Sequence, residues 1–262
     1  MKLIYYGGLD FGSSGARISI ISNNYETVFE NSTNYVYEFN NPKGWIIACE
    51  ELLKSIPSCI KDNLSKLSIS GTSGTLLACS IKGKYLGDAI PYHKSCNIEK
   101  SLINSIAGQN KTLTSPYSSL SKALELLDIH GPNILLRHQS DWITGWMLKN
   151  WQFGEEGNNI KLGWDVSSSS WPKDFNSIYW KESLPKIKKS GESLGKIHIS
   201  VAKKLKLNQN LIIVAGTTDS NASYIAANVQ EKCGLTVLGT TIVIKKRISK
   251  PIKAIGITNH RI

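Results

Sequence analysis

The chain has 262 residues, 41% of them hydrophobic, which is enough apolar material for one large domain or two modest ones. Its 31 basic residues against 20 acidic ones give a formal charge of +11, which favours anionic partners such as nucleotides or phosphosugars. The basic residues are spread along the chain without interleaved aromatic residues, so the composition does not indicate a nucleic-acid-binding protein.

Two features of the sequence bear on the compartment of the protein. The first apolar run, 3–9, is broken by Asp10 and is too short for a signal peptide, and no stretch reaches the roughly 20 apolar residues of a membrane-spanning helix. The five cysteines have neither CxxC nor Cys/His ligand spacing, and their apolar neighbours indicate reduced, buried thiols. We therefore expect a cytoplasmic protein without a membrane partner.

The N-terminal pattern predicts three strands at about 3–10, 16–22 and 25–32. Glycine and serine between the first two strands indicate a tight turn, because glycine adopts the positive φ angles that hairpin turns need. Asn23-Asn24 predicts a two-residue turn between the second and third strands, since asparagine tolerates the left-handed conformation. The chain is therefore expected to open with an antiparallel meander.

The rest of the chain predicts a mixture of strands and helices. Helices are expected at 44–56, 119–128, 138–150 and 219–228, and strands at 66–70, 75–81 and 211–215. A hairpin is expected from 235–238 and 241–245, while the polar stretch 152–170, rich in glycine and serine, is expected to be irregular. Because we find no internal repeat and no low-complexity tract, one α/β domain is the better interpretation.

Three turns combine glycine with hydroxyl residues directly after a strand: Asp10–Gly15, Gly216–Asp219 and Leu238–Thr241. In the first and third, glycines allow a ligand to approach the backbone, while amide and hydroxyl groups donate to phosphate oxygens. Asp10, at a strand end beside turn amides, suits a metal-bound phosphate. Each turn alone is as well explained by a hairpin or a helix cap. Together they predict an ATP-handling site, with Asp219 as a general base at the start of a helix.

Other polar and aromatic residues have structural explanations that we favour over ligand binding. Asp141 is expected to pair or cap on a helix surface, and Asp165 to form a turn. His138 is expected to be a structural hydrogen-bond donor. Trp142 and Trp146 lie four residues apart on one helix face, a spacing typical of core residues rather than of a sugar-binding platform.

Six motifs, in order, resemble those of the FGGY carbohydrate kinases, and most closely the ribulose kinase-like branch of cyanobacteria and plants: GLDFGSSGAR, ISGTSGTLLACS, LLRHQSDWITGWML, GWDV, AGTTDSNASYIAA and LGTTIVIK. The resemblance runs over essentially the whole chain. It implies an α/β fold of the actin/hexokinase type, with two RNase H-like lobes. Residues 1–248 would form the N-terminal lobe, a mixed sheet flanked by helices, and 249–262 would begin the C-terminal lobe.

The resemblance implies ATP-dependent phosphorylation of a sugar hydroxyl, with ATP and Mg2+ as cofactors and a ketopentose such as D-ribulose as substrate. Asp10 matches the aspartate that organises magnesium and the transferring phosphate, and Ser73 matches a sugar-contacting serine. Asp219 matches the catalytic base, which also meets the sugar. The two phosphate-binding turns match Gly12, Ser13, Ser14 and Gly15 in the first and Gly239, Thr240 and Thr241 in the second.

The match ends at Ile262, where family members enter the second lobe that carries the adenosine-binding turn. One interpretation is a kinase whose missing lobe is supplied by a second chain. The alternative is a remnant lobe that binds sugar without ATP turnover. A basic nucleic-acid-binding protein is the third and least favoured class.

Overall fold

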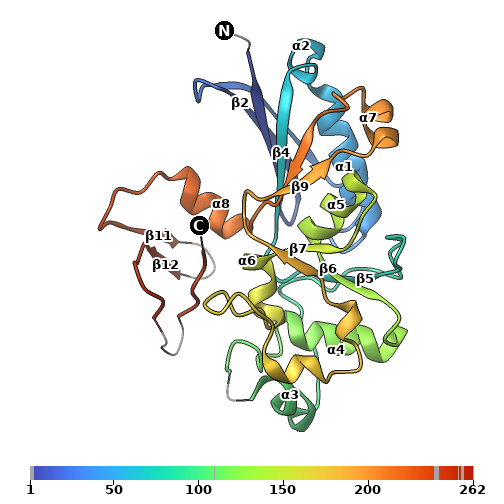
Figure 1. Ribbon diagram of the computed structural model, residues 1–262, viewed down its shortest axis with the longest axis vertical. Helices are drawn as coiled ribbons and strands as arrows, with labels where there is room; N and C mark the ends of the chain where they lie inside the picture. Colours follow the sequence, from blue (N-terminus) through green and yellow to red (C-terminus); the bar gives the residue numbers. More distant parts are fainter. Residues whose placement is uncertain (1–2, 109, 239–241, 253, 255–256, 262) are drawn as a thin grey trace.

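The fold is built around a six-stranded mixed sheet. The computed structural model describes residues 3–108, 110–238, 242–252, 254 and 257–261. The strand order of the sheet is β3–β2–β1–β4–β10–β9 (Figure 1). The strands are Tyr5–Phe11 (β1), Gly15–Ser22 (β2), Thr27–Asn34 (β3), Leu64–Gly71 (β4), Ser193–Lys196 (β9) and Ile212–Val214 (β10). The strands β1, β4 and β10 are parallel to one another, whereas β2, β3 and β9 pair antiparallel with their neighbours.

The predicted N-terminal meander is confirmed, with strand limits close to those expected from the sequence. In β2, Ala16, Ile18 and Ile20 are buried and alternate with more exposed residues, because successive side chains of a strand point to opposite faces of the sheet. The turn that joins β1 to β2 follows Asp10 and Phe11, as the glycines of this stretch indicated.

The loop between β2 and β3 differs from the prediction. The positive φ angle, 64°, is at Tyr25 and not at the two asparagines. The Ser22 amide donates to the Glu26 carbonyl oxygen (2.9 Å), and the Asn24 amide donates to the Ser22 hydroxyl (3.2 Å). The loop is therefore longer than the two-residue turn that Asn23-Asn24 predicted, and the Ser22 side chain helps to close it.

Three helices pack on one face of the sheet: Pro42–Ser55 (α1), Gln139–Leu148 (α5) and Ile199–Leu205 (α7) (Figure 1). The helix α1 begins after Asn41, whose side chain accepts a hydrogen bond from the Lys43 amide (3.0 Å) and so caps the first turn. The first hydrophobic core lies between these helices and the sheet, and it includes Leu9, Ile18, Trp45, Leu52, Leu67, Ile69, Ile143, Met147, Val201 and Leu205. The helices predicted from 44 and from 138 are confirmed.

A second core lies beyond the end of the sheet. It is enclosed by Leu76–Cys79 (β5), Leu135–His138 (β6), Ser119–His130 (α4) and Lys100–Ala107 (α3). The strand β5 belongs to both cores, because Leu77 and Cys79 pack in the first and Leu76 and Ala78 in the second. This two-residue alternation makes β5 the shared wall between the two parts.

The stretch 152–170 is not irregular throughout, so that prediction is wrong. It contains Phe153–Glu155 (β7), Glu156–Asn159 (α6) and a 3-10 turn, Ile160–Leu162, and all four residues of α6 are buried. Its buried polar residues Glu155, Asn158 and Asn159 are hydrogen-bonded to distant parts of the chain, which local sequence does not reveal. Also missed were Ser58–Lys61 (α2), Lys186–Lys188 (β8), α3, α7, β6, β9 and two further 3-10 turns, Lys173–Asn176 and Lys181–Ser183.

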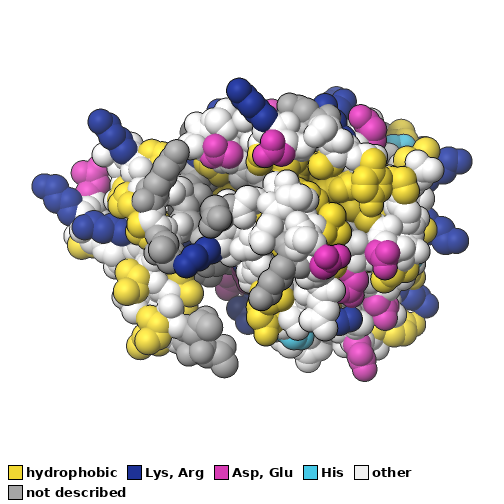
Figure 2. Space-filling model, turned by 90° about the horizontal axis from the view of Figure 1, so that it is seen from below, with side chains coloured by type: hydrophobic (Ala, Val, Ile, Leu, Met, Phe, Trp, Pro, Cys, Tyr) yellow, Lys and Arg dark blue, Asp and Glu magenta, His cyan; other side chains and the backbone are white. Residues whose placement is uncertain are grey.

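The C-terminal elements follow the prediction. Asp219–Ala226 forms α8, and Gly234–Leu238 (β11) pairs antiparallel with Ile242–Lys246 (β12). Of the five cysteines, all free, Cys49, Cys79 and Cys96 are buried as expected, whereas Cys59 and Cys233 are exposed, so the expectation of buried thiols is wrong for these two. Within the described residues, no helix is long and apolar enough to cross a membrane. On the face shown in Figure 2, lysine and arginine side chains stand apart from one another rather than forming one basic patch.

A first prediction concerns Gly216, which follows β10 where the chain passes closest to β4. A Cβ atom at this position would lie 1.8 Å from the Ile69 carbonyl oxygen. Gly216→Ala should therefore lower the free energy of unfolding by about 1–3 kcal/mol, since the strands must separate to admit the methyl group. The control is Gly8→Ala in β1, where the nearest atom is the Ser68 hydroxyl oxygen at 3.9 Å. Urea unfolding should show the control unchanged or slightly stabilised, and equal midpoints for the two variants would contradict the prediction.

Candidate active site

The candidate site lies where three parallel strands end together. Parallel strands have their carboxyl ends at the same edge of a sheet, and ligands of α/β proteins bind at such edges. Asp10 in β1 pairs with Ser70 in β4, and Gly71, the last residue of β4, forms a bridge with Thr218 beyond the end of β10. The structure thereby brings the turn after Asp10, the turn that holds Ser73 and the first residue of α8, Asp219, to one edge.

Asp10 is half-buried and carries an unsatisfied carboxylate oxygen. Its Oδ1 atom is buried and accepts no hydrogen bond from any group in the described part of the chain. Burial raises the pKa of Asp10, and the charge of Asp219 raises it further. Arg17, which pairs with Asp10 from β2, lowers it. Two carboxylates thus lie close enough to repel each other. A cation between them, or beside Asp10, would relieve this cost.

The donor set at this edge fits a magnesium ion that is shared with a ligand. The described residues contain no group of three or more His, Cys, Asp or Glu side chains placed to hold a metal on their own. Magnesium is typically bound by one or two carboxylates together with phosphate oxygens and water, so the orphaned oxygen of Asp10 suits it. The structure supports Asp10 as the residue that would hold the ion.

In the turn 12–15, the amides of Ser13 and Ser14 donate to no acceptor among the described residues. The Gly12 amide donates to the Gly15 carbonyl oxygen (2.9 Å), which closes the turn, and the Ser13 and Ser14 side chains are exposed. A Cβ atom on Gly15 would lie 2.2 Å from the Thr33 carbonyl oxygen, so only glycine allows β3 to approach here. Successive backbone amides in such a turn form a concave anion site. The second predicted phosphate turn, 239–241, lies outside the described residues.

Asp219 opens α8, as predicted. The helix is capped by Thr218, whose hydroxyl accepts a hydrogen bond from the Asn221 amide (3.2 Å), and Asp219 is the acidic residue of the first turn. Two lysines face it: burial lowers the pKa of Lys161 and of Lys245, and the charge of Asp219 opposes the shift in both. The Asp219 carboxylate therefore stabilises the charged forms of both lysines.

Ser73 lies in a turn that is fixed by hydrogen bonds to Gln139. The Thr72 amide and hydroxyl both donate to Gln139 Oε1 (3.0 and 2.8 Å), and Gln139 is fully buried at the start of α5. The Lys161 ammonium lies over the same turn, 3.7 Å from the position that a Cβ atom of Gly74 would take. Lys161 thus lies near both Ser73 and Asp219. Sequence reasoning missed it, because only its tertiary position separates it from the other lysines of the chain.

Asp141 is not on a helix surface, so that prediction is wrong. Its side chain is buried, with Oδ1 accepting from the Glu155 amide (2.9 Å) and Oδ2 from Asn159 Nδ2 (3.2 Å). His138 Nδ1 is 3.6 Å from the same Oδ2, and its Nε2 is 2.9 Å from the Ser119 hydroxyl, so the histidine is structural as expected. These contacts join α5, β7 and α6 into one polar network.

Glu155 is the centre of that network. Its two oxygens accept hydrogen bonds from the Gly157 amide, the Asn158 amide and the Ser190 hydroxyl, at 2.9, 2.9 and 2.8 Å. Burial raises the pKa of Glu155 to about 7, against these hydrogen bonds. A Cβ atom of Gly157 would lie 3.2 Å from Asn221 Nδ2 of α8. The network therefore packs against the helix that begins with Asp219.

Two further expectations are confirmed. Asp165 forms a turn, accepting hydrogen bonds from the Ser167 amide (2.8 Å) and hydroxyl (2.6 Å). Trp142 is buried in the first core, and Trp146 packs against it, so neither is a sugar-binding platform.

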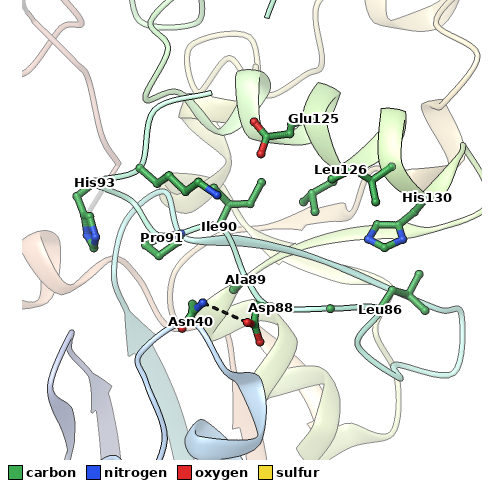
Figure 3. Close-up of a pocket in the computed structure, with 13 residues that line it drawn as sticks. Asn40, Leu86, Asp88, Ala89, Ile90, Pro91, His93, Glu125, Leu126 and His130 are labelled. Atoms are coloured by element: carbon green, nitrogen blue, oxygen red, sulfur yellow. Dashed lines mark hydrogen bonds between the residues drawn. The ribbon is translucent and has the colours of Figure 1, made fainter. Parts of the chain in front are cut away.

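A separate cavity of about 580 Å³ is open beside α4 (Figure 3). Among the residues that line it are Asn40, Asp88, His93, Glu125 and His130, and Asn40 is hydrogen-bonded to Asp88 (3.3 Å). None of the site residues predicted from the sequence lines this cavity. It is therefore distinct from the edge that holds Asp10 and Asp219.

The chain is similar to several sugar kinases, although no family model matches it. It is 22% identical over 268 residues to the xylulose kinase of Lactococcus lactis, covering 92% of this chain and 53% of that protein. It superimposes on a gluconate kinase from Lactobacillus acidophilus with a TM-score of 0.80 at 18% identity, covering 96% of this chain and 55% of that one. A xylulose kinase from Lactobacillus acidophilus gives a TM-score of 0.79 at 18% identity, covering 95% and 55%. The chain thus spans about half the length of the relatives it matches, and it has their α/β fold of the actin/hexokinase type.

A second prediction concerns the pH dependence of stability. The pKa of Glu155 is about 7 in the folded chain and ordinarily near 4.5, so the folded state binds more protons between these values. The contribution of Glu155 should therefore fall as the pH rises from about 4.5 to about 7, by an amount on the order of 1–3 kcal/mol. Glu155→Gln should lack this part of the pH profile, and Glu182→Gln, at an exposed position, should keep it. Parallel profiles for the unmodified chain and Glu155→Gln in urea unfolding would contradict the assignment.

Proposed function

We propose that residues 1–248 form the sugar- and phosphate-binding lobe of an ATP-dependent carbohydrate kinase of the FGGY type. The observation that carries the proposal is the convergence of Asp10, the Ser73 turn and Asp219 at the carboxyl ends of β1, β4 and β10. Each comes from a different strand, and together they offer a cation ligand, a hydroxyl and a carboxylate base. The named sugar kinases with this fold add support.

In the proposed reaction, Asp219 accepts the proton of the sugar hydroxyl as its oxygen attacks the terminal phosphorus of ATP, and ADP leaves. The amides of the turn 12–15 donate to phosphate oxygens, which carry the negative charge. Magnesium held by Asp10 would neutralise part of that charge. Lys161 and Lys245 bring positive charge close to Asp219, at the edge where the phosphate is proposed to bind.

For the substrate we propose a ketopentose, with D-ribulose first and D-xylulose second. The resemblance of the motifs to the ribulose kinase-like branch favours the former, and the names of two relatives, both xylulose kinases, favour testing the latter. The gluconate kinase neighbour adds a sugar acid to the panel. Because the match covers about half of each relative, we also propose that the adenosine-binding lobe lies outside these residues.

A third prediction tests the proposed reaction in the 262-residue chain. Alone, it should bind ATP weakly and turn over D-ribulose at a rate reduced on the order of 10³-fold or more from that of a complete kinase, since positioning and water exclusion are incomplete. Asp219→Asn should abolish the remaining ADP release, and Asp128→Asn, an exposed aspartate of α4, should not.

The outcomes of this assay separate the alternatives. Robust turnover that Asp219→Asn abolishes would mean that a dimer of this chain completes the site. Turnover that survives Asp219→Asn would contradict the assigned base. Sugar binding without any turnover, lost in Ser73→Ala, would support the remnant lobe in place of the kinase.

A fourth prediction tests the assignment of the cation to Asp10. Inorganic tripolyphosphate should bind the unmodified chain at least about tenfold more tightly with magnesium than without it, because the ion removes repulsion between the carboxylate and the phosphate oxygens. Asp10→Asn should abolish most of this difference, and Asp128→Asn should preserve it. Isothermal titration calorimetry with and without MgCl2 gives both affinities. An undiminished magnesium effect in Asp10→Asn would place the ion elsewhere.

A further inference from the structure

Tyr35 holds the phosphate turn by two hydrogen bonds. It follows β3 directly, and its backbone amide donates to the Ser14 carbonyl oxygen (3.2 Å), while its hydroxyl donates to the Gly12 carbonyl oxygen (2.9 Å). The half-buried ring packs against the first core and beside Phe39, with 6.3 Å between the ring centroids. Tyr35 is therefore fixed in place independently of any ligand.

These two bonds decide where the turn amides point. A trans peptide unit is planar, so its N–H points opposite to its C=O. Because the Gly12 carbonyl is directed at Tyr35, the Ser13 amide of the same peptide is directed away from it. Within the described residues the Ser13 and Ser14 amides donate to no protein acceptor. By binding the Gly12 carbonyl, the Tyr35 hydroxyl thus orients the Ser13 amide away from the protein interior, where it can meet a ligand.

The protonation of Tyr35 suits this role. Burial and the charge of Asp10 raise the pKa of Tyr35 above its usual value. The hydroxyl therefore keeps its proton over the physiological range and remains a donor to Gly12. The influence of Asp10 also indicates that Tyr35 lies near the carboxylate proposed to hold magnesium.

Gln139 holds the Ser73 turn from the start of α5. Its Oε1 accepts both hydrogen bonds from Thr72, which fixes the orientation of the carboxamide. The Gln139 side chain opposes the rise in the pKa of Tyr35, so the two side chains lie near each other, and Gln139 Nε2 is buried with no hydrogen-bond partner among the described groups.

We propose that Tyr35 is a positioning residue for phosphate binding: by holding the Gly12 carbonyl, its hydroxyl aims the Ser13 amide at a phosphate oxygen. The inference rests on the proposed function, since it takes the turn 12–15 as the phosphate site. Tyr35 itself touches neither the sugar nor the phosphate.

The test uses magnesium tripolyphosphate, which needs no adenosine site, and follows the Ser13 amide by NMR. In the unmodified chain the ligand should shift this amide in a saturable manner. Tyr35→Phe removes only the hydroxyl, and its affinity should fall by about 3- to 10-fold, the effect of one hydrogen bond. The Ser13 nitrogen should also shift in the free variant, because the Gly12 carbonyl has lost its donor. Tyr25→Phe, at a position 87% exposed in the β2–β3 loop, is the control and should match the unmodified chain.

Each outcome decides one point. Unchanged affinity and an unchanged Ser13 signal in Tyr35→Phe, with the unmodified chain binding, would overturn the role of Tyr35 and leave the proposed kinase function standing. Loss of affinity together with dispersed shifts of amides across the first core would mean that the substitution disrupts the fold, and would also count against a local role. Absence of tripolyphosphate binding to the unmodified chain would overturn the phosphate turn itself, and with it the inference.

Discussion

The candidate site depends on the close parallel packing of β4 between β1 and β10. Pairing of Asp10 with Ser70, and of Gly71 with Thr218, brings the ends of three strands to the same level. This packing is possible because Gly216 has no side chain, so its backbone can lie against the Ile69 carbonyl. Separating β10 from β4 by the width of a methyl group would carry Asp219 away from Asp10. The distance between the two carboxylates is therefore set by backbone contact rather than by side-chain choice.

The charges at this edge depend on one another for the same reason. Asp219 disfavours the ionised form of Asp10, whereas Arg17 favours it, and Asp219 in turn stabilises the charged forms of Lys161 and Lys245. Because these groups lie partly out of solvent, salt screens them less than it screens surface charges. A polyphosphate brings further negative charge to the edge. Its binding is thus coupled to a cation at Asp10, which is why phosphate and magnesium are proposed to enter together.

The parts of the fold that sequence predicts are those fixed by local chemistry. The β1–β2 hairpin follows from its glycine turn, and the start of α8 follows from the residues before it that can cap a helix, Thr218 among them. The environment of Asp141 and the element α6 could not be predicted, because their polar side chains are satisfied by residues distant in sequence, such as Ser190 for Glu155. The same holds for Lys161: nothing in its neighbours indicates that its ammonium lies over the Ser73 turn. Local pattern gives the longer strands and the glycine turns but not the short strands β8 and β9, and tertiary hydrogen bonds decide which polar residues are buried.

The Ser73 turn also lies at the joint between the two cores. It connects β4, which packs in the first core, to β5, whose residues alternate between the first core and the second. Apolar contacts are non-directional and tolerate small shifts of one core against the other. Hydrogen bonds are directional, and those of Gln139 to Thr72 and of Asp141 to Glu155 and Asn159 cross this joint from the first turn of α5. The precision of the candidate site therefore comes from the polar residues of α5, which tie both parts of the chain to one helix.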